Sequence, residues 1–373
     1  MGRTLEKITV QGFKSIRSLE NFALDQELNI LIGANGAGKS NFVEFFRVLR
    51  AMLERRLQTH ITQAGAADGY FHHGIKFTKE IRTDLKFGYN RHAVTWTSTA
   101  DNKLMIASEI AQYIGPNTNG IEHLVTSGAL ESGLYDQREK KAYDAKSKGP
   151  IGYVYDALSA WQVYHFHDTG MTAGMRRDVG LDQGTELKPD ASNLAAFLYQ
   201  WQNDHADSYK LLNDTIKRVA PYFDRFHLVE KEGALENTVR LTWRQKGSDY
   251  LFQPSHFSDG TIRFICLAAC LLQPTPPSTI VLDEPEIGLH PQALGLLAGI
   301  MRSASKRMQM IVATQSPVLL SEFPPQQIVT VNQVNGASVF ERLNAEALND
   351  WLADYTVGDL WQKGVIQGGP NHA

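Results

Sequence analysis

The sequence contains almost no cysteine and no long apolar run. Its two cysteines, Cys266 and Cys270, are four residues apart in an apolar segment that should be helical. We expect small core side chains, because two ligands on one helix face cannot complete a tetrahedral metal site. No stretch approaches the roughly 18 apolar residues of a membrane span, and the N-terminus lacks the apolar core of a secretory signal. We therefore expect a cytoplasmic protein that does not bind membranes.

The sequence also lacks an excess of charge of one sign. Its 37 Lys and Arg residues face 40 Asp and Glu residues, which gives a formal net charge of −3. A nucleic-acid-binding domain is usually strongly basic, so any DNA contact must be local. Residues 127–149 form either a solvated helix or loop, or a DNA-facing patch. The basic residues of this segment are Arg138, Lys140, Lys141, Lys146 and Lys148, interleaved with acids.

Length and hydrophobic patterning predict an α/β chain. A chain of 373 residues exceeds the size at which one core stops growing, so we expect one composite domain or two lobes. Short β runs occupy residues 6–10 and 28–32, and alternation over residues 81–107 indicates antiparallel strands. After Gly260 strands and helices alternate, which indicates a largely parallel sheet.

Residues after Asn41 predict a helix with one buried face, because apolar side chains recur at intervals of three and four. Arg47 and Arg50 fall between them and should point outward. Residues 193–219 also look helical, and residues 239–243 alternate as a strand. The apolar positions of the first helix are Phe42, Phe45, Phe46, Leu49, Met52 and Leu53.

A complete P-loop pattern follows the second β run. Glycines let the backbone turn tightly and aim N–H groups at phosphate oxygens, while the following helix presents its positive end. Lys39 would neutralise the β and γ phosphates, and the Ser40 hydroxyl would bind Mg²⁺. The predicted ATP-binding residues here are Gly33, Ala34, Asn35, Gly36, Ala37, Gly38, Lys39, Ser40 and Asn41.

A second motif ends the apolar run 280–282 with two adjacent acids, Asp283 and Glu284. A parallel strand delivers such residues to its carboxyl end, where α/β sheets bind ligands. Neighbouring strand residues point in opposite directions, so the two acids can have different tasks. One carboxylate would bind Mg²⁺ and the other would polarise the attacking water.

A third motif, Ser258, Asp259 and Gly260, lies directly before a predicted helix, where an anion can bind. Together with residues 286–291, the motifs have the order and spacing of ABC-type ATPase heads. Residues 12–16 resemble the opening of RecF and SMC heads, and the whole chain resembles the bacterial RecF-like ATPase group related to the ATPase half of OLD proteins.

This resemblance implies a P-loop NTPase head of the ABC type. Its fold would have a mixed central sheet, an antiparallel β subdomain and an inserted helical lobe. The implied division is an N-terminal ATPase lobe with the P-loop (1–80), an antiparallel β part (81–115), an inserted helical or mixed lobe (116–222) and a C-terminal ATPase lobe (223–373). The last part holds the signature, Walker B and D-loop motifs.

The resemblance also assigns residues to roles. Glu284 would be the general base, Asp283 would bind Mg²⁺, and Lys14 would join the nucleotide-binding residues. Two ATP molecules would be sandwiched in a homodimer, each capped by Ser258 and Gly260 of the opposite subunit. Where most of these ATPases place a histidine that senses the γ phosphate, this chain has Gln315, which cannot carry a proton charge and predicts slow turnover.

Several assignments stay open at this point. The Q-loop glutamine is Gln58 or Gln63, and His165 with His167 is either a metal-binding pair or a structural or partner-contact pair. The favoured function is an ATPase switch acting on DNA or on a separate nuclease or toxin effector, in bacterial DNA maintenance or phage defence. The alternative is a nucleotide-locked scaffold with little turnover.

Overall fold

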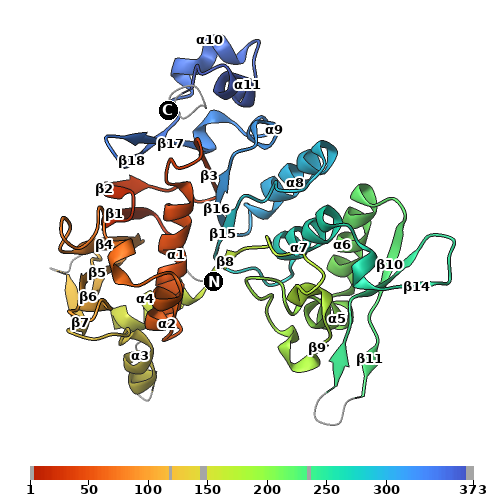
Figure 1. Cartoon of the computed structure of the whole chain (residues 1–373), viewed down its shortest axis with the longest axis horizontal. Helices are drawn as coiled ribbons and strands as arrows, with labels where there is room; N and C mark the ends of the chain where they lie inside the picture. Colours follow the sequence, from red (N-terminus) through yellow and green to blue (C-terminus); the bar gives the residue numbers. More distant parts are fainter. Residues whose placement is uncertain (1–3, 117–119, 143–148, 233–236, 367–373) are drawn as a thin grey trace.

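In the computed structural model, which describes residues 4–116, 120–142, 149–232 and 237–366, a mixed sheet of six strands forms the centre of the fold (Figure 1). The strand order is β18-β17-β3-β16-β15-β8. Neighbours from β17 to β8 are parallel, whereas β18 runs antiparallel to β17. The strands are β3 (Leu28–Ile32), β8 (Trp161–Tyr164), β15 (Thr279–Asp283), β16 (Gln309–Thr314), β17 (Ile328–Val334) and β18 (Ala337–Arg342).

An antiparallel sheet of the order β2-β1-β4-β5-β6-β7 builds the N-terminal lobe. Because β7 pairs with β6, the predicted boundary after residue 115 does not separate sheets. The strands are β1 (Lys7–Phe13), β2 (Ile16–Ala23), β4 (Ile81–Phe87), β5 (Asn90–Ser98), β6 (Leu104–Tyr113) and β7 (Ile121–Thr126). The helices of this lobe are α1 (Lys39–Leu53), α2 (Leu57–Gln63), α3 (Leu134–Ala142) and α4 (Gly149–Ser159).

Helices and small sheets form the second lobe, drawn in green in Figure 1, and the chain then returns through the central sheet to a C-terminal helical segment. From the second lobe to the C-terminal segment, the helices are α5 (Leu194–Asp204), α6 (Ala206–Val219), α7 (Asp259–Leu272), α8 (Pro291–Ala304), α9 (Pro317–Leu320), α10 (Asn349–Leu352) and α11 (Val357–Gln362). The short strands are β9 (Val179–Gly180), β10 (Phe223–His227), β11 (Glu230–Lys231), β12 (Thr238–Val239), β13 (Thr242–Gln245) and β14 (Leu251–Phe252). The 3-10 helices are η1 (Ala67–Tyr70), η2 (Gly174–Arg176), η3 (Leu181–Gly184), η4 (Pro254–His256), η5 (Pro325–Gln327) and η6 (Glu346–Leu348).

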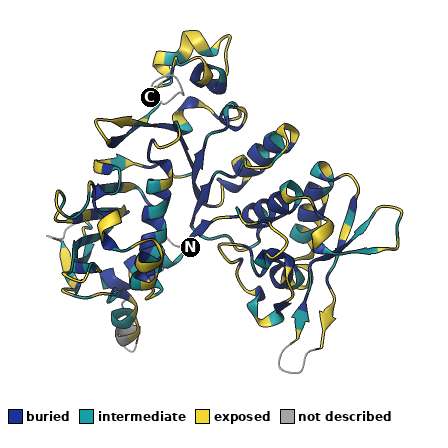
Figure 2. Cartoon of the chain, in the orientation of Figure 1, coloured by how far each residue is buried: buried dark blue, intermediate teal, exposed yellow. Residues whose placement is uncertain are grey.

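The central sheet separates two hydrophobic cores, and its inner strands are buried on both faces (Figure 2). Successive strand residues point to opposite faces. Accordingly Ile280 and Leu282 pack in the core with α7 and α8, whereas Val281 packs in the core with α1. Continuous apolar runs are the pattern expected of such doubly covered parallel strands.

The buried face predicted for α1 is confirmed, since all six of its apolar positions are buried. The outward orientation predicted for its two arginines is wrong. Arg50 donates to the carbonyl oxygens of Ser159 (2.8 Å) and Trp161 (3.0 Å), and Arg47 contacts Asp283. A polar helix face can meet polar partners as well as solvent, and periodicity does not distinguish the two.

Two predicted elements are interrupted. The helix over residues 193–219 breaks at His205, whose φ of −141° is not helical, so α5 and α6 are separate. The strand over 239–243 is divided between β12 and β13, which belong to different small sheets. The N–H of Thr242 donates to the carbonyl of Arg240 and makes the turn between them.

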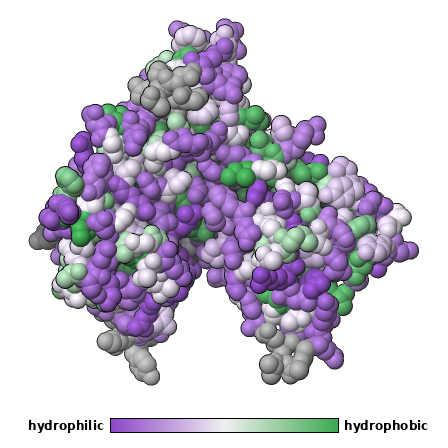
Figure 3. All heavy atoms as spheres, viewed as in Figure 1, coloured by the Kyte–Doolittle hydropathy of each residue, from purple (hydrophilic) through white to green (hydrophobic). Residues whose placement is uncertain are grey.

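The outer surface is mainly hydrophilic on the face seen in Figure 3. Cys266 and Cys270 are buried free thiols, as predicted. In the basic segment, Arg138 pairs with Glu139 and Asp156, while Lys146 and Lys148 lie outside the described residues. Within the ranges given above, every helix is too short or too polar to traverse a bilayer.

A buried polar cluster fixes the entry to α3. The carboxylate of Glu109 accepts from Ser132 Oγ (2.8 Å) and the Gly133 N–H (3.2 Å), and its Oε1 lies 3.0 Å from His92 Nε2. Both Glu109 and His92 are fully buried. Buried groups of this kind are costly to leave without partners.

Glu109→Ala should therefore lower the free energy of unfolding by about 3 kcal/mol or more, because the buried Ser132 and His92 and the partly buried Gly133 N–H lose their acceptor. Urea denaturation followed by circular dichroism measures the change. Glu122→Ala, on the neighbouring strand at an exposed position, is the control and should stay within about 0.5 kcal/mol of the parent. Equal stability of the two variants would contradict this account of the cluster.

Candidate functional site

The P-loop connects the end of β3 to the start of α1. Gly38 has a φ of 112°, and a Cβ atom built there would lie 1.9 Å from Ser338 Oγ. Ser338 Oγ donates to the Ala37 carbonyl (2.6 Å) and lies 2.7 Å from Ser15 Oγ, a second hydroxyl within hydrogen-bond distance. The turn is thus held from outside by a hydroxyl that leaves room only for glycine.

Lys39 is the first residue of α1 and is buried. Its Nζ donates to the carbonyl oxygens of Gly33 (2.6 Å) and Ala34 (3.1 Å), which places the ammonium inside the turn. Burial lowers the pKa of Lys39, while the nearby carboxylates, Glu284 first among them, oppose this shift. The next residue, Ser40, is exposed.

Parallel pairing brings the acids of β15 to the same sheet edge as the P-loop. Asp283 pairs in register with Ala313, and Thr314 pairs with Ile32, so β15, β16 and β3 finish side by side. The side chain of Asp283 is only 7 % exposed. Its Oδ2 accepts from Arg47 Nη2 at 3.2 Å, whereas its buried Oδ1 has no hydrogen-bond partner.

Glu284 turns away from the strand direction with a φ of 47°, while its N–H still donates to the Ala313 carbonyl (2.8 Å). Its Oε1 accepts a hydrogen bond from Gln315 Nε2. The N–H of Gln315 donates in turn to Glu286 Oε1 (2.7 Å). Gln315 is thereby fixed between two carboxylates.

Glu286 adds a third carboxylate to this edge. Burial raises the pKa of Glu286, and the nearby charge of Glu284 adds to the shift. Like Asp283 Oδ1, its Oε2 is buried without a hydrogen-bond partner. Buried acceptors without partners are rare in folded proteins, and they often indicate an ion or a catalytic role.

These groups fit ATP with Mg²⁺. Magnesium prefers hard oxygen ligands and usually keeps several waters, and the site offers the exposed Ser40 hydroxyl and the unpartnered oxygen of Asp283. The backbone turn ahead of Lys39 opens at a helix N-terminus, which suits phosphate. The side chains needed to hold both groups therefore converge here.

The signature segment lies at the start of α7. Ser258 is its N-cap and accepts from the Thr261 N–H (3.1 Å). Asp259 pairs with the buried Arg176 at 3.0 Å, although its own side chain is exposed. Among the residues that the structure describes, no hydrogen bond or ion pair joins 258–260 to the P-loop of the same chain.

The signature and the D-loop touch directly. A Cβ atom at Gly260 would lie 2.4 Å from the carbonyl oxygen of Gly288, so only glycine allows this approach. One turn further along α7, Arg263 donates to the carbonyls of Phe166 (2.9 Å), His167 (3.0 Å) and Ile287. This arginine joins the signature helix, the D-loop and the segment after β8.

Other predicted residues lie at the edge of this region or outside it. Lys14 places its Nζ 4.4 Å from the centre of the Tyr70 ring. Gln58 donates to the carbonyls of Leu104 (2.8 Å) and Leu130 (2.7 Å), so it is engaged away from the site. Gln63 is exposed at the end of α2.

The rings of His165 and His167 are in contact, with centroids 3.9 Å apart and an angle of 48° between their planes. Nδ1 of His165 accepts from Arg47 Nη2 (3.2 Å), and Nε2 of His167 lies 3.1 Å from the Asp283 carbonyl oxygen. Burial lowers the pKa of His165 to about 4, and His167 and Arg47 add to the shift. In the described part of the chain, no three His, Cys, Asp or Glu side chains gather as a metal site. His167 thus contacts Asp283 directly, and His165 contacts the arginine that pairs with Asp283.

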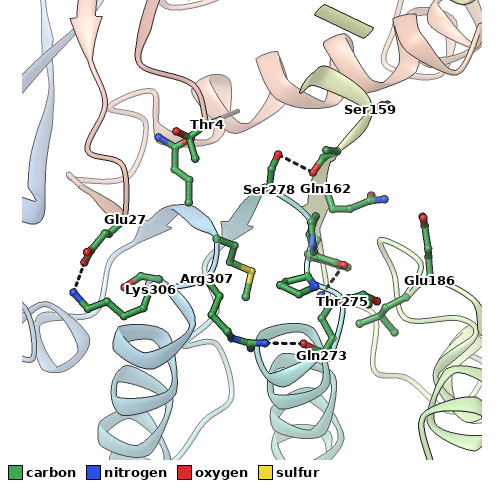
Figure 4. Close-up of a pocket in the computed structure, with 18 of the residues that line it drawn as sticks. Thr4, Glu27, Ser159, Gln162, Glu186, Gln273, Thr275, Ser278, Lys306 and Arg307 are labelled. Carbon is green, nitrogen blue, oxygen red and sulfur yellow. Dashed lines mark hydrogen bonds and ion pairs between the residues drawn. The ribbon is translucent and has the colours of Figure 1, made fainter. Parts of the chain in front are cut away.

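A cavity of about 640 Å³ lies at the opposite end of the central sheet (Figure 4). Its lining comes from the starts of β15 and β16 and from β8 with the segment before it. Lys306 pairs there with Glu27 (2.6 Å), and Arg307 donates to the Gln273 carbonyl (3.1 Å). The cavity lies at the amino ends of these strands, whereas the candidate nucleotide site lies at their carboxyl ends, where parallel sheets bind ligands. The two sites are therefore separate.

Sequence reasoning missed Arg47 and the buried Oε2 of Glu286, which has no hydrogen-bond partner. Arg47 lies on the polar side of an amphipathic helix, and no local signal distinguishes it from a solvated arginine. The acidic D-loop residue is visible in the sequence, but its burial follows from the packing of Gln315 against it.

Two family matches cover most of the chain. Residues 4–169 match the AAA ATPase domain family, and residues 184–321 match the AAA domain family named for the AbiEii toxin of a type IV TA system. No curated protein matches the chain. Neither family description mentions OLD proteins, so that relation stays a prediction.

Solved SMC head domains have the same fold. One is an SMC head bound to the C-winged helix domain of ScpA, with a TM-score of 0.55 and 14% identity over 93% of this chain and 99% of that one. Another is an SMC head with an extended coiled coil bound to the C-terminal domain of ScpA, derived from Pyrococcus furiosus, with a TM-score of 0.51 and 14% identity over 94% and 98%. Identity this low establishes the fold alone. Taken with the motifs and both ATPase-domain matches, it supports an assignment of the chain to the RecF- and SMC-like ABC-type ATPases.

Proposed function

We propose that the chain binds ATP with Mg²⁺ and hydrolyses it. The observation that carries this proposal is the buried, unpartnered Oδ1 of Asp283 at the sheet edge where the P-loop also opens. An acceptor buried without a partner costs about 1–3 kcal/mol, and a cation ligand would remove that cost. Its position beside Lys39 is the arrangement that a metal-bound triphosphate requires.

The proposed roles follow from position. The backbone of residues 33–38 and the ammonium of Lys39 bind the phosphates, and Ser40 with Asp283 holds the metal. Mg²⁺, when bound, would neutralise charge on the phosphate oxygens. Glu284 is the general base that takes a proton from the attacking water. Gln315, which hydrogen-bonds Glu284, orients that carboxylate.

We further propose that catalysis needs a homodimer. Ser258 is exposed and makes its hydrogen bonds within its own turn, not with the P-loop of the same chain. A helix N-terminus of this kind can bind phosphate brought by another subunit. The signature of one protomer would then cap the nucleotide of its partner, and hydrolysis would reopen the dimer.

The biological setting is proposed from analogy. An ATP-driven dimer can act as a switch on DNA or on a separate nuclease or toxin effector, and the AbiEii-type description of residues 184–321 favours a toxin system. Bacterial DNA maintenance and phage defence, in the cytoplasm, are the settings that suit such a switch.

A nucleotide-locked scaffold is the second candidate. The observation in its favour is the hydrogen bond from Gln315 to Glu284, which occupies an oxygen of the proposed base. Phosphate release measured with and without duplex DNA separates the candidates. DNA-stimulated turnover would exclude the scaffold, whereas tight ATP binding with no turnover under either condition would exclude the hydrolytic switch.

Two substitutions should separate binding from hydrolysis. Lys39→Ala should abolish ATP binding, because it removes the ammonium from the phosphate turn. Glu284→Gln should keep binding but slow phosphate release by about 10²- to 10⁴-fold, the usual contribution of a general base. Fluorescent-nucleotide titration and a phosphate-release assay measure the two effects. Undiminished turnover in both variants would refute the assigned site.

The dimer makes its own prediction. In the Glu284→Gln background, ATP with Mg²⁺ should double the mass measured by light scattering. Adding Ser258→Arg should prevent this, because the long side chain fills the proposed interface. Ser303→Arg, at an exposed position on α8, is the matched control and should still dimerise. Dimerisation that survives Ser258→Arg would place the interface elsewhere.

A further inference from the structure

Arg47 lies between two carboxylates on different elements. Its Nη2 is 3.2 Å from Oδ2 of Asp283, and its Nη1 is 3.5 Å from Oε2 of Glu44. The guanidinium is partly buried, with 26% of the side chain exposed. It therefore already contacts a second acceptor while it neutralises the Walker B aspartate.

The carboxylate of Glu44 is fixed in position by two other side chains. His60 Nε2 lies 2.7 Å from Glu44 Oε1, and the Tyr70 hydroxyl donates to the same oxygen at 2.9 Å. Burial acts against ionisation, but the hydrogen bond and charge of His60 hold the pKa of the Glu44 carboxyl below its usual value. Both bonds use Oε1, so the charged Oε2 remains directed at Arg47.

Asp283 offers its two oxygens unequally. Arg47 takes Oδ2, and Oδ1 is buried without a partner. Each positive charge on one carboxylate weakens the attraction of the next, and in a partly buried site this repulsion is screened less than in water. A cation that approaches Asp283 thus competes electrostatically with Arg47.

We propose that Arg47 is a charge gate for the metal site: it holds Asp283 until a divalent cation arrives with the nucleotide, and then remains paired with Glu44 alone. The exchange needs only side-chain rotation, because Glu44 and Arg47 are three residues apart on one helix. This inference rests on the proposed function and deepens it. The gate makes cation binding conditional on displacing a bound guanidinium.

His165 fits the same exchange. Its Nδ1 accepts from the same Arg47 Nη2 that donates to Asp283. In the proposed exchange the guanidinium would leave both His165 and Asp283 and remain paired with Glu44 on α1. The neighbouring His167 contacts the Asp283 carbonyl, which joins the segment after β8 to the end of β15. His165 and His167, which follow β8, therefore contact both partners of the Arg47–Asp283 ion pair.

The test compares nucleotide affinity with and without Mg²⁺. In the full chain carrying Glu284→Gln, the dissociation constant of a fluorescent ATP analogue is measured in MgCl2 and in EDTA. The Kd in EDTA divided by the Kd in MgCl2 is the ratio that reports how strongly the cation assists binding. Arg47→Met should raise this ratio about two- to fivefold, the range expected from losing one ion-pair competitor. An unchanged or smaller ratio would overturn the gate.

Two variants control the experiment. Arg47→Lys keeps the charge and should leave the ratio near that of the parent, so a rise equal to that of Arg47→Met would contradict a charge gate. Arg55→Met removes an exposed charge that pairs with Asp136 and should change nothing. If the parent itself fails to bind the analogue in MgCl2, the proposed function fails. If it binds and Arg47→Met leaves the ratio unaltered, the gate alone fails.

Discussion

The carboxyl ends of β3, β16 and β15 finish level because the three strands are parallel and paired in register. This constraint brings the turn at residues 33–38 next to the acids and Gln315, which follow it more than two hundred residues later in the chain. The two hydrophobic cores on either face keep the strands in place. A one-residue slip of β15 would exchange its buried side chains between cores, so packing fixes the site indirectly.

Charge is distributed unevenly at this edge. Asp283, Glu284 and Glu286 face the two cations Lys39 and Arg47, and two of their oxygens are buried without hydrogen-bond partners. Such an arrangement is unfavourable in isolation, because buried charges need compensation. It is typical of sites whose stability is sacrificed for a ligand of opposite charge.

The motif residues could be predicted from the sequence because each motif is contiguous. The run before Asp283 is apolar throughout, and the spacing of the aromatic residues after Asn41 is helical. The strand, the helix and the sheet edge where they meet could therefore be predicted. The central sheet and the antiparallel lobe agree with that prediction.

Contacts between distant segments could not be predicted in the same way. Arg47 meets Asp283 only because α1 crosses the end of β15, and Gln58 is engaged because the segment after β7 passes over α2. The break at His205 separates two helices that share one continuous periodic pattern. In each instance tertiary geometry decides between alternatives that local patterning leaves equal.

The approach of Gly260 to Gly288, and the three carbonyls gathered by Arg263, have a mechanical consequence. Segments that would face another subunit are fastened to each other and to the backbone beside Asp283. A neighbour that pushes on Ile287 would therefore shift the start of α7 together with His165 and His167. Pressure at the protein surface would thus reach Asp283 through directly contacting segments.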